Sequence, residues 1–107
     1  MKSMTYAEAL KSAIRSEMQK DPEVFMAGED ISVMGGSFGV SAGLFAEFGP
    51  ERIVNCPISE TAIIGMGVGA AAAGMRPIVE LMYLDFAGCA MDEIMNQAAK
   101  MRYMFGG

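Results

Sequence analysis

The sequence predicts an α/β domain whose parallel β-sheet is flanked by helices on both faces. The first observation is three short, mostly apolar runs, at 24–28, 52–56 and 76–83. Strands of a parallel sheet tend to be apolar along their whole length because both of their faces are buried. The second observation is that helical patterns precede, separate and follow these runs, an alternation typical of α/β proteins. At 107 residues, the chain has the size of a single domain, 1–107.

The first helix is predicted to begin after Thr5 and to end at Asp21-Pro22. Thr5 and Glu8 have the spacing of a capping box, in which each side chain accepts a hydrogen bond from the backbone of the other residue. Proline disfavours helical geometry in the residue before it, which accounts for the end. The apolar stripe of this helix is Ala7, Leu10, Ile14 and Met18.

A glycine-rich connection is predicted over 29–43, before a short helix at 44–48 that Gly49 would close. The stretch 35–39 has the glycine content of a phosphate-binding loop. It lacks the Lys and the Ser or Thr that such a loop uses to hold phosphate and magnesium. We therefore expect a flexible connection here.

The last helix is predicted over 86–105, directly after the third strand. Its apolar residues recur at the three- and four-residue spacing of one helix face. The members of this face are Ala87, Met91, Ile94, Ala98 and Met101.

Charge and composition argue against several classes of protein. The net charge is −5 and the isoelectric point about 4.6, which disfavours binding to nucleic acid or to an anionic membrane surface. The N-terminus alternates charged and apolar residues, unlike a signal peptide. We expect a cytoplasmic protein that contacts neither nucleic acid nor membrane.

The cysteines and methionines point to packing and not to metal chemistry. The chain has no His, and Cys56 and Cys89 stand far apart in sequence, so no metal site is predicted. Both are expected to be buried free thiols. Twelve Met and a hydrophobic fraction of 52% indicate an adaptable core or a large buried interface.

A single carboxylate, Glu60, stands at the start of an uncharged segment that runs from Thr61 to Met75. Ser59 is expected to be the N-cap of a helix that begins there. Two roles fit Glu60. It is either a helix-start acid stabilised by the helix dipole, or a working acid desolvated by its apolar neighbours and paired with a ligand.

Gly65, Gly67 and Ala70 have nearly the spacing of a dinucleotide-binding fingerprint. The objection is length, since too few residues follow for a crossover helix before the third strand. We therefore expect these glycines inside a helix, with Gly65 and Gly69 facing a neighbouring backbone. A dinucleotide-binding module and a non-catalytic assembly domain remain as alternatives.

Several separate segments carry a resemblance that covers essentially the whole chain. They are TYAEALKSAIRSEM, VFMAGEDI, GGSFGVSAGL, CPISETAIIGMGVGAAAAGMRPIVELMYLDF and MDEIMNQAAKMRYMFGG. Together they resemble the β subunit of thiamine-diphosphate-dependent 2-oxoacid dehydrogenases. The resemblance implies a transketolase-like pyrimidine-binding domain, as the N-terminal part of a longer chain. MRYMFGG is most similar to acetoin dehydrogenases, with pyruvate dehydrogenases close behind.

The resemblance also implies roles for individual residues. Glu60 matches the family's glutamate that hydrogen-bonds the pyrimidine ring nitrogen and helps to activate the cofactor. Phe86 matches the aromatic residue that packs on the pyrimidine, and Ile58 and Glu29 match further residues around that ring. Some relatives have Gln where this chain has Cys89, so a polar contact at that position is not expected.

The family's division of labour implies partners for this chain. An α subunit would hold the diphosphate with Mg²⁺, within a heterotetramer of two α and two β chains. A lipoyl-bearing acyltransferase would accept the acyl group after cleavage of a bond next to a carbonyl. The chain alone is expected to be inactive, because half of the cofactor site would be missing.

Overall fold

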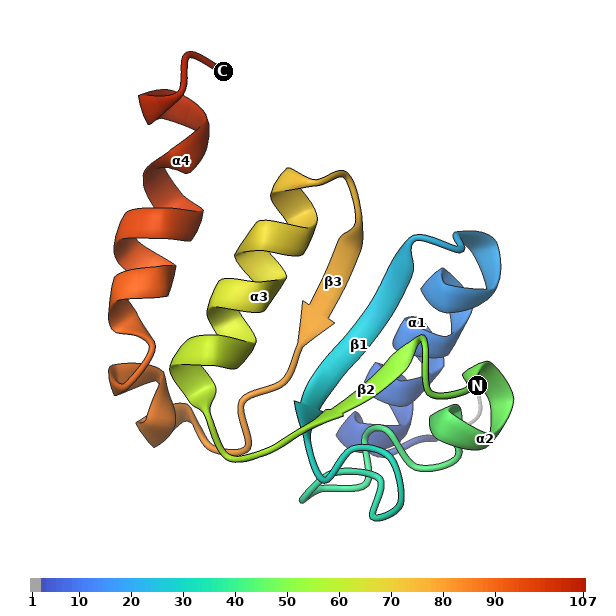
Figure 1. The fold of residues 1–107 in the computed structure, drawn as a ribbon. Coiled ribbons are helices and arrows are strands. Elements are labelled where there is room, and N and C mark those ends of the chain that lie inside the picture. The colour runs from blue at the N-terminus through green and yellow to red at the C-terminus, as the bar shows by residue number, and fades with distance from the viewer. Residues whose placement is uncertain (1–2) are drawn as a thin grey trace.

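In a computed structural model that describes residues 3–107, helices lie on both faces of a three-stranded parallel sheet (Figure 1). This arrangement confirms the predicted α/β class. The elements in chain order are α1 (Tyr6–Lys20), β1 (Val24–Glu29), α2 (Leu44–Phe48), β2 (Ile53–Cys56), α3 (Glu60–Ala72), β3 (Arg76–Val79), the 3₁₀ turn η1 (Leu84–Gly88), the π-helical segment η2 (Glu93–Ala98) and α4 (Ala99–Met104).

The strand order is β2-β1-β3, so the first strand is central and the other two pair with it in parallel. Met26 of β1 lies opposite Ile53 on one side and Ile78 on the other. All six residues of β1 are buried, as expected for a strand with neighbours at both edges and helices on both faces. The two crossovers run in opposite directions across the sheet, and α2 and α3 lie on opposite faces (Figure 1).

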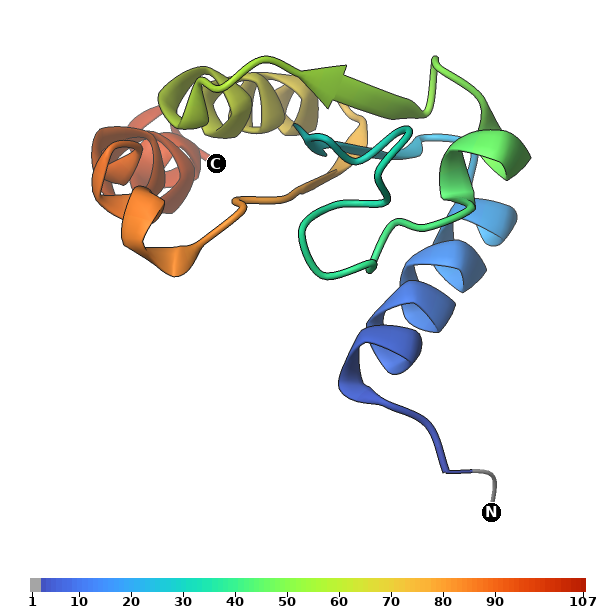
Figure 2. The same cartoon turned by 90° about the horizontal axis from the view of Figure 1, so that it is seen from below.

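The predicted capping box of α1 is present. The Glu8 amide donates to the Thr5 hydroxyl at 3.2 Å, and the Thr5 amide donates to the Glu8 carboxylate at 2.7 Å. Hydrogen bonds from the Thr5 amide and the Thr5 hydroxyl to the Glu8 carboxylate hold the pKa of this carboxyl below its usual value. The apolar stripe packs on the core only through its second half, Ile14 and Met18, because the start of α1 projects beyond the sheet (Figure 2) and Leu10 is 43% exposed.

The core lies between the sheet and the layer formed by α1 and α2. Its buried members are Met18, Val24, Met26, Ile31, Leu44 and Ile53. Partly buried side chains complete it, among them Ile14 at the end of the stripe and Phe45 and Phe48 of α2. The short helix α2 therefore contributes one fully buried residue, Leu44, and two partly buried aromatic rings to the core.

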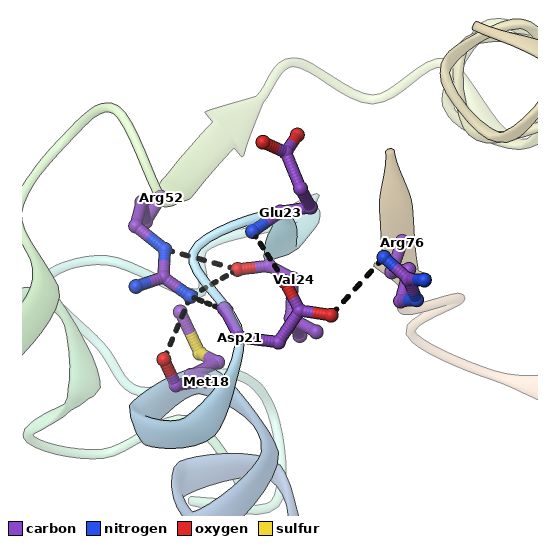
Figure 3. A network of polar contacts seen from close by, with 6 residues as sticks. All are labelled: Met18, Asp21, Glu23, Val24, Arg52 and Arg76. Atoms are coloured by element: carbon purple, nitrogen blue, oxygen red, sulfur yellow. Dashed lines mark hydrogen bonds and ion pairs between the residues drawn. The ribbon is translucent and has the colours of Figure 1, made fainter. Parts of the chain in front are cut away.

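One arginine joins the end of α1 to the start of β1 (Figure 3). The Arg52 guanidinium donates hydrogen bonds to the carbonyl oxygens of Met18, Asp21 and Val24. It also lies 5.3 Å from the centre of the Phe48 ring. Nearby, the Asp21 carboxylate pairs with Arg76 at 3.1 Å, which links the same turn to β3.

The third strand and the last helix differ from the prediction. β3 ends at Val79 instead of 83, because its pairing with β1 stops at Ala27, although β1 itself continues to Glu29 beside β2. The last ladder-like bond joins the Glu80 amide to the Ala27 carbonyl at 2.9 Å. The predicted helix 86–105 is divided into η1 and a helix over 91–104 that contains η2. Two residues of the predicted face are exposed, Met91 before the π-helical segment and Ala98 at its end.

The glycines of α3 lie inside a helix, as predicted, but they do not face a neighbouring backbone. A Cβ at Gly65 would lie 3.3 Å from the carboxylate of Glu93, and one at Gly69 would meet nothing within 4 Å. The closest approach is at Gly67, where a Cβ would lie 2.8 Å from a methyl group of Val79. The predicted backbone contacts at Gly65 and Gly69 are therefore wrong within the described residues.

The thiols are less buried than expected. Cys56 is partly buried at the end of β2, whereas Cys89 is exposed in the turn after η1. The prediction of two buried thiols is thus wrong for Cys89, because that turn lies at the surface.

Across residues 3–107, no helix combines the length and apolarity needed to cross a membrane.

Candidate functional site

The candidate residues come from segments that leave the carboxyl ends of the strands, at the lower edge of the sheet in Figure 1. Glu29 ends β1, and the link after β2 leads through Ile58 into Glu60, the first residue of α3. The segment after β3 leads to Phe86 in η1. This is the edge at which open α/β sheets bind ligands.

Glu29 fixes the backbone just before Glu60. Its side chain is buried, with 5% exposed, and its carboxylate accepts a hydrogen bond from the Ser59 amide at 3.3 Å. Ser59 is the N-cap residue by position, as predicted, but its hydroxyl does not cap the helix. It turns back and donates to the Pro57 carbonyl at 2.8 Å, so the Glu29 carboxylate engages the Ser59 amide at this helix start.

Thr61 fixes the backbone just after Glu60. Its hydroxyl donates to the Cys89 carbonyl at 2.6 Å, which ties the first turn of α3 to the turn after η1. Sequence reasoning missed this contact, and the only available signal was a hydroxyl residue beside the acid. Both neighbours of Glu60 are therefore held, one by β1 and the other by the segment that carries Phe86.

The Glu60 carboxylate itself is left free. It has no hydrogen-bond or ion-pair partner within residues 3–107, and it lines a hollow of about 540 Å³ at the start of α3. A second carboxylate, that of Glu93 in η2, lines the same hollow. The other lining residues are Ser59, Thr61, Ala62, Gly65 and Met66.

The remaining predicted residues do not line this hollow. Ile58 is 82% exposed on the link between β2 and α3. Phe86 is partly exposed and packs edge-to-face on Tyr83, with ring centres 5.8 Å apart. Glu29 reaches the backbone beside Glu60 but not the hollow. The described chain therefore assembles the supports of Glu60, while Ile58 and Phe86 present apolar surface separately.

Burial explains the state of two groups near this edge. It raises the pKa of the Cys56 thiol, and the nearby Glu29 carboxylate adds to the rise while a backbone hydrogen bond at Gly28 opposes it. The thiol is thus neutral and a poor nucleophile at ordinary pH. Burial also raises the pKa of the Glu80 carboxyl, one oxygen of which is buried without a hydrogen-bond partner.

The described part of the chain holds no cluster of three metal-ligating side chains.

Residues 2–106 match the family model described as the transketolase pyrimidine-binding domain. The chain belongs to this family. It is 50% identical to the β subunit of the acetoin:2,6-dichlorophenolindophenol oxidoreductase of Cupriavidus necator, with 92% of this chain covered. It is 48% identical to the pyruvate dehydrogenase E1 component subunit β of Rickettsia bellii and 46% identical to the 2-oxoisovalerate dehydrogenase subunit β of Bacillus subtilis, with 97% and 96% covered.

The chain spans about a third of the length of these curated relatives, 32% in each case. Membership of the family confirms the resemblance seen in the sequence. The dinucleotide-binding alternative is wrong, because residues 61–64 are helical and Gly65 lies within α3 instead of at a turn between strand and helix. The transketolase-like pyrimidine-binding domain is therefore the framework for Glu60.

Proposed function

We propose that this chain is the pyrimidine-binding part of the β subunit of a thiamine-diphosphate-dependent dehydrogenase of the acetoin or pyruvate type. The observation that carries the proposal is the setting of Glu60. Its carboxylate is free and lines a hollow, while the residues on either side are tethered to β1 and to the turn after η1. A carboxyl that only stabilised a helix start would need no such support.

The residues present fit an aminopyrimidine ring. Such a ring offers a nitrogen at its edge and two apolar faces. Glu60 provides a carboxyl without a partner in the described chain, and Phe86 and Ile58 provide exposed apolar surface near the same sheet edge. In the proposed complex Glu60 holds the ring nitrogen and Phe86 packs on a face. Ile58 and Glu29 complete the surroundings of the ring.

Thiamine diphosphate, when bound, supplies a carbon nucleophile and an electron sink for cleaving a bond next to a carbonyl. The contribution of this chain is proton transfer and positioning. Glu60 shares a proton between its carboxyl oxygen and the ring nitrogen, which is general acid–base chemistry by a positioned side chain. Glu29 and Thr61 hold the backbone on both sides, so the Glu60 carboxyl starts from a defined place.

The proposed function includes other chains. An α subunit would hold the diphosphate and Mg²⁺, and a second β subunit would complete a heterotetramer. A lipoyl-bearing acyltransferase would accept the acyl group, and the assembly would be cytoplasmic. The names of the relatives support this proposal, because they are β subunits, one of them of an E1 component.

The substitution Glu60→Gln in the assembled enzyme tests the proposal. The amide keeps the shape of the carboxyl but cannot exchange a proton in the same way. Hydrogen–deuterium exchange at the thiazolium carbon of bound thiamine diphosphate should slow by roughly 10²–10⁴-fold, the usual contribution of a positioned acid or base. Cofactor affinity should change less, because the amide still forms a hydrogen bond.

Glu93→Gln is the matched control, since Glu93 lines the same hollow and has no assigned proton to transfer. Its exchange rate should stay near that of the unchanged enzyme. An unaltered exchange rate in Glu60→Gln would contradict the proposal. It would leave Glu60 as a helix-start acid worth about 0.3–1 kcal/mol of stability.

A further inference from the structure

Three aromatic rings form a continuous chain that ends at Phe86. The Phe38 ring packs edge-to-face on Tyr83, with centres 5.7 Å apart and planes at 77°. The Tyr83 ring packs in the same way on Phe86, with centres 5.8 Å apart and planes at 83°. Phe38 belongs to the connection between β1 and α2, so this aromatic chain joins that connection to η1.

A second contact joins the same two segments. Gly36 lies against Glu80, because a Cβ at Gly36 would stand 3.0 Å and 3.3 Å from the two carboxylate oxygens. Gly36 also has a φ of 75°, a left-handed conformation that favours glycine. Figure 2 shows this connection alongside the chain that leaves β3. Gly36 therefore contacts Glu80 and Phe38 contacts Tyr83, both on the segment that leads to Phe86.

The connection between β1 and α2 is itself ordered by buried contacts. The Ser41 side chain is fully buried, and its hydroxyl donates to the Ile31 carbonyl at 2.9 Å. The Gly36 amide donates to the Asp30 carbonyl at 3.0 Å, and the Ser41 amide donates to the Gly35 carbonyl at 3.1 Å. Phe38 is thus presented to Tyr83 from a defined loop.

Phe86 is not oriented by the core. Its side chain is 38% exposed, and it lies on the five-residue turn η1, none of whose residues is buried. The edge-to-face contact with Tyr83 is therefore a main restraint on the plane of its ring, since such pairs have a preferred geometry. Tyr83 is in turn 46% exposed and restrained by Phe38.

We propose that Phe38 and Tyr83 are positioning residues that set the orientation of Phe86 toward a flat heteroaromatic ring. This inference rests on the proposed function, in which Phe86 packs on the pyrimidine. Phe38 acts through Tyr83, and Tyr83 acts through Phe86. The connection between β1 and α2 thereby helps to determine how firmly the cofactor is held.

The test is a double-mutant cycle in the assembled enzyme, read as the dissociation constant of thiamine diphosphate in the presence of Mg²⁺ by calorimetry. Phe38→Leu, Tyr83→Leu and Phe86→Leu should each weaken binding by about two- to tenfold, the effect of losing one aromatic pair. Phe38→Leu should add nothing once Phe86 is Leu, because the two residues act in series. Tyr83→Phe keeps the ring and should restore binding.

Tyr6→Leu is the matched control, because Tyr6 is an aromatic residue at the exposed start of α1, 85% exposed and outside the aromatic chain. It should leave the dissociation constant unchanged. Circular dichroism verifies that each variant is folded. If Tyr83→Leu fails to fold, the Phe38 and Phe86 variants still complete the cycle.

The outcomes distinguish the positioning role of Phe38 and Tyr83 from the proposed function. If Phe86→Leu weakens binding but Phe38→Leu has no effect, or the two effects multiply, the positioning role is overturned and the proposed function stands. If Phe86→Leu leaves binding unchanged, the assignment of Phe86 to the pyrimidine fails, and the positioning role fails with it. Weakened binding with no further loss in the double variant supports the inference.

Discussion

Glu60 is placed by its neighbours in sequence and not by contacts of its own. The Ser59 amide and the Thr61 hydroxyl make the hydrogen bonds, to Glu29 and to the Cys89 carbonyl. Each such bond contributes about 0.5–1.5 kcal/mol net. Substitution of Glu60 should therefore change the free energy of unfolding little. An effect of such a substitution on catalysis can then be measured without a large effect on folding.

Sequence reasoning proposed Glu60 and Glu29 as site residues but missed the hydrogen bonds that hold the backbone beside Glu60. Glu60 was visible as the one carboxylate at the start of an uncharged segment. The bond from Thr61 to the Cys89 carbonyl joins residues 28 apart in the chain. A contact between a side chain and a distant main-chain oxygen follows from the fold and has no characteristic spacing, so no pattern in the sequence predicts it.

Glu80 should make stability depend on pH. Partial burial raises the pKa of its carboxyl in the folded chain. Below the unfolded pKa of about 4.3, the carboxyl is protonated in both states and its ionisation does not affect stability. As the pH rises through the folded pKa, stability is lost, because the folded chain must either retain the proton or ionise a partly buried group.

The substitution Glu80→Gln should remove this dependence. The variant should gain stability relative to the unchanged protein between about pH 4 and about pH 8, by a few degrees in melting temperature. Thermal unfolding of both proteins at the two pH values measures the effect. A difference in melting temperature that stays constant, or that falls as the pH rises, would contradict the assignment.

At the scale of elements, the sequence predicted which strands form better than where they end. The periodic and apolar patterns located all three strands and α1, since they report burial. The end of β3 depends on where its pairing with β1 stops, although β1 itself continues beside β2, and the break before 91–104 follows the 3₁₀ turn η1. Neither depends on the local residues alone.

The turn between α1 and β1 is held by the side chain of Arg52, the residue just before β2. This contact gives a prediction at the scale of elements. Arg52 donates to three carbonyl oxygens from one planar guanidinium. Lysine keeps the charge but has no planar fork to reach all three. Arg52→Lys should lower the free energy of unfolding by about 1–3 kcal/mol.

Urea denaturation measures this loss. Arg102→Lys is the matched control, because Arg102 lies exposed on α4, and substitutions at exposed positions usually change stability by less than about 0.5 kcal/mol. Equal stability of Arg52→Lys and the unchanged protein would mean that a single ammonium suffices at this turn.

At the scale of the whole molecule, one side of the domain is apolar and uncovered. A groove of about 640 Å³ lies between α3, β3 and α4, on the side where Figure 1 shows α4 standing away from the sheet. Phe105 lines this groove, and three consecutive large apolar side chains near the end of the chain are exposed, Tyr103, Met104 and Phe105, by 90%, 70% and 80%. Contiguous apolar surface of this kind marks interfaces.

The purified 107-residue chain should therefore associate with itself when no partner covers this surface. Light scattering should give a mass well above the 11.4 kDa of one chain. Met104→Lys and Phe105→Lys together should lower that mass, because each places a charge where association would bury it. Tyr6→Lys, on the far side of the sheet at the start of α1, should not. A monodisperse monomer at high concentration would show that the apolar surface is tolerated in water, and the case for an obligatory partner at α3 and α4 would then fail.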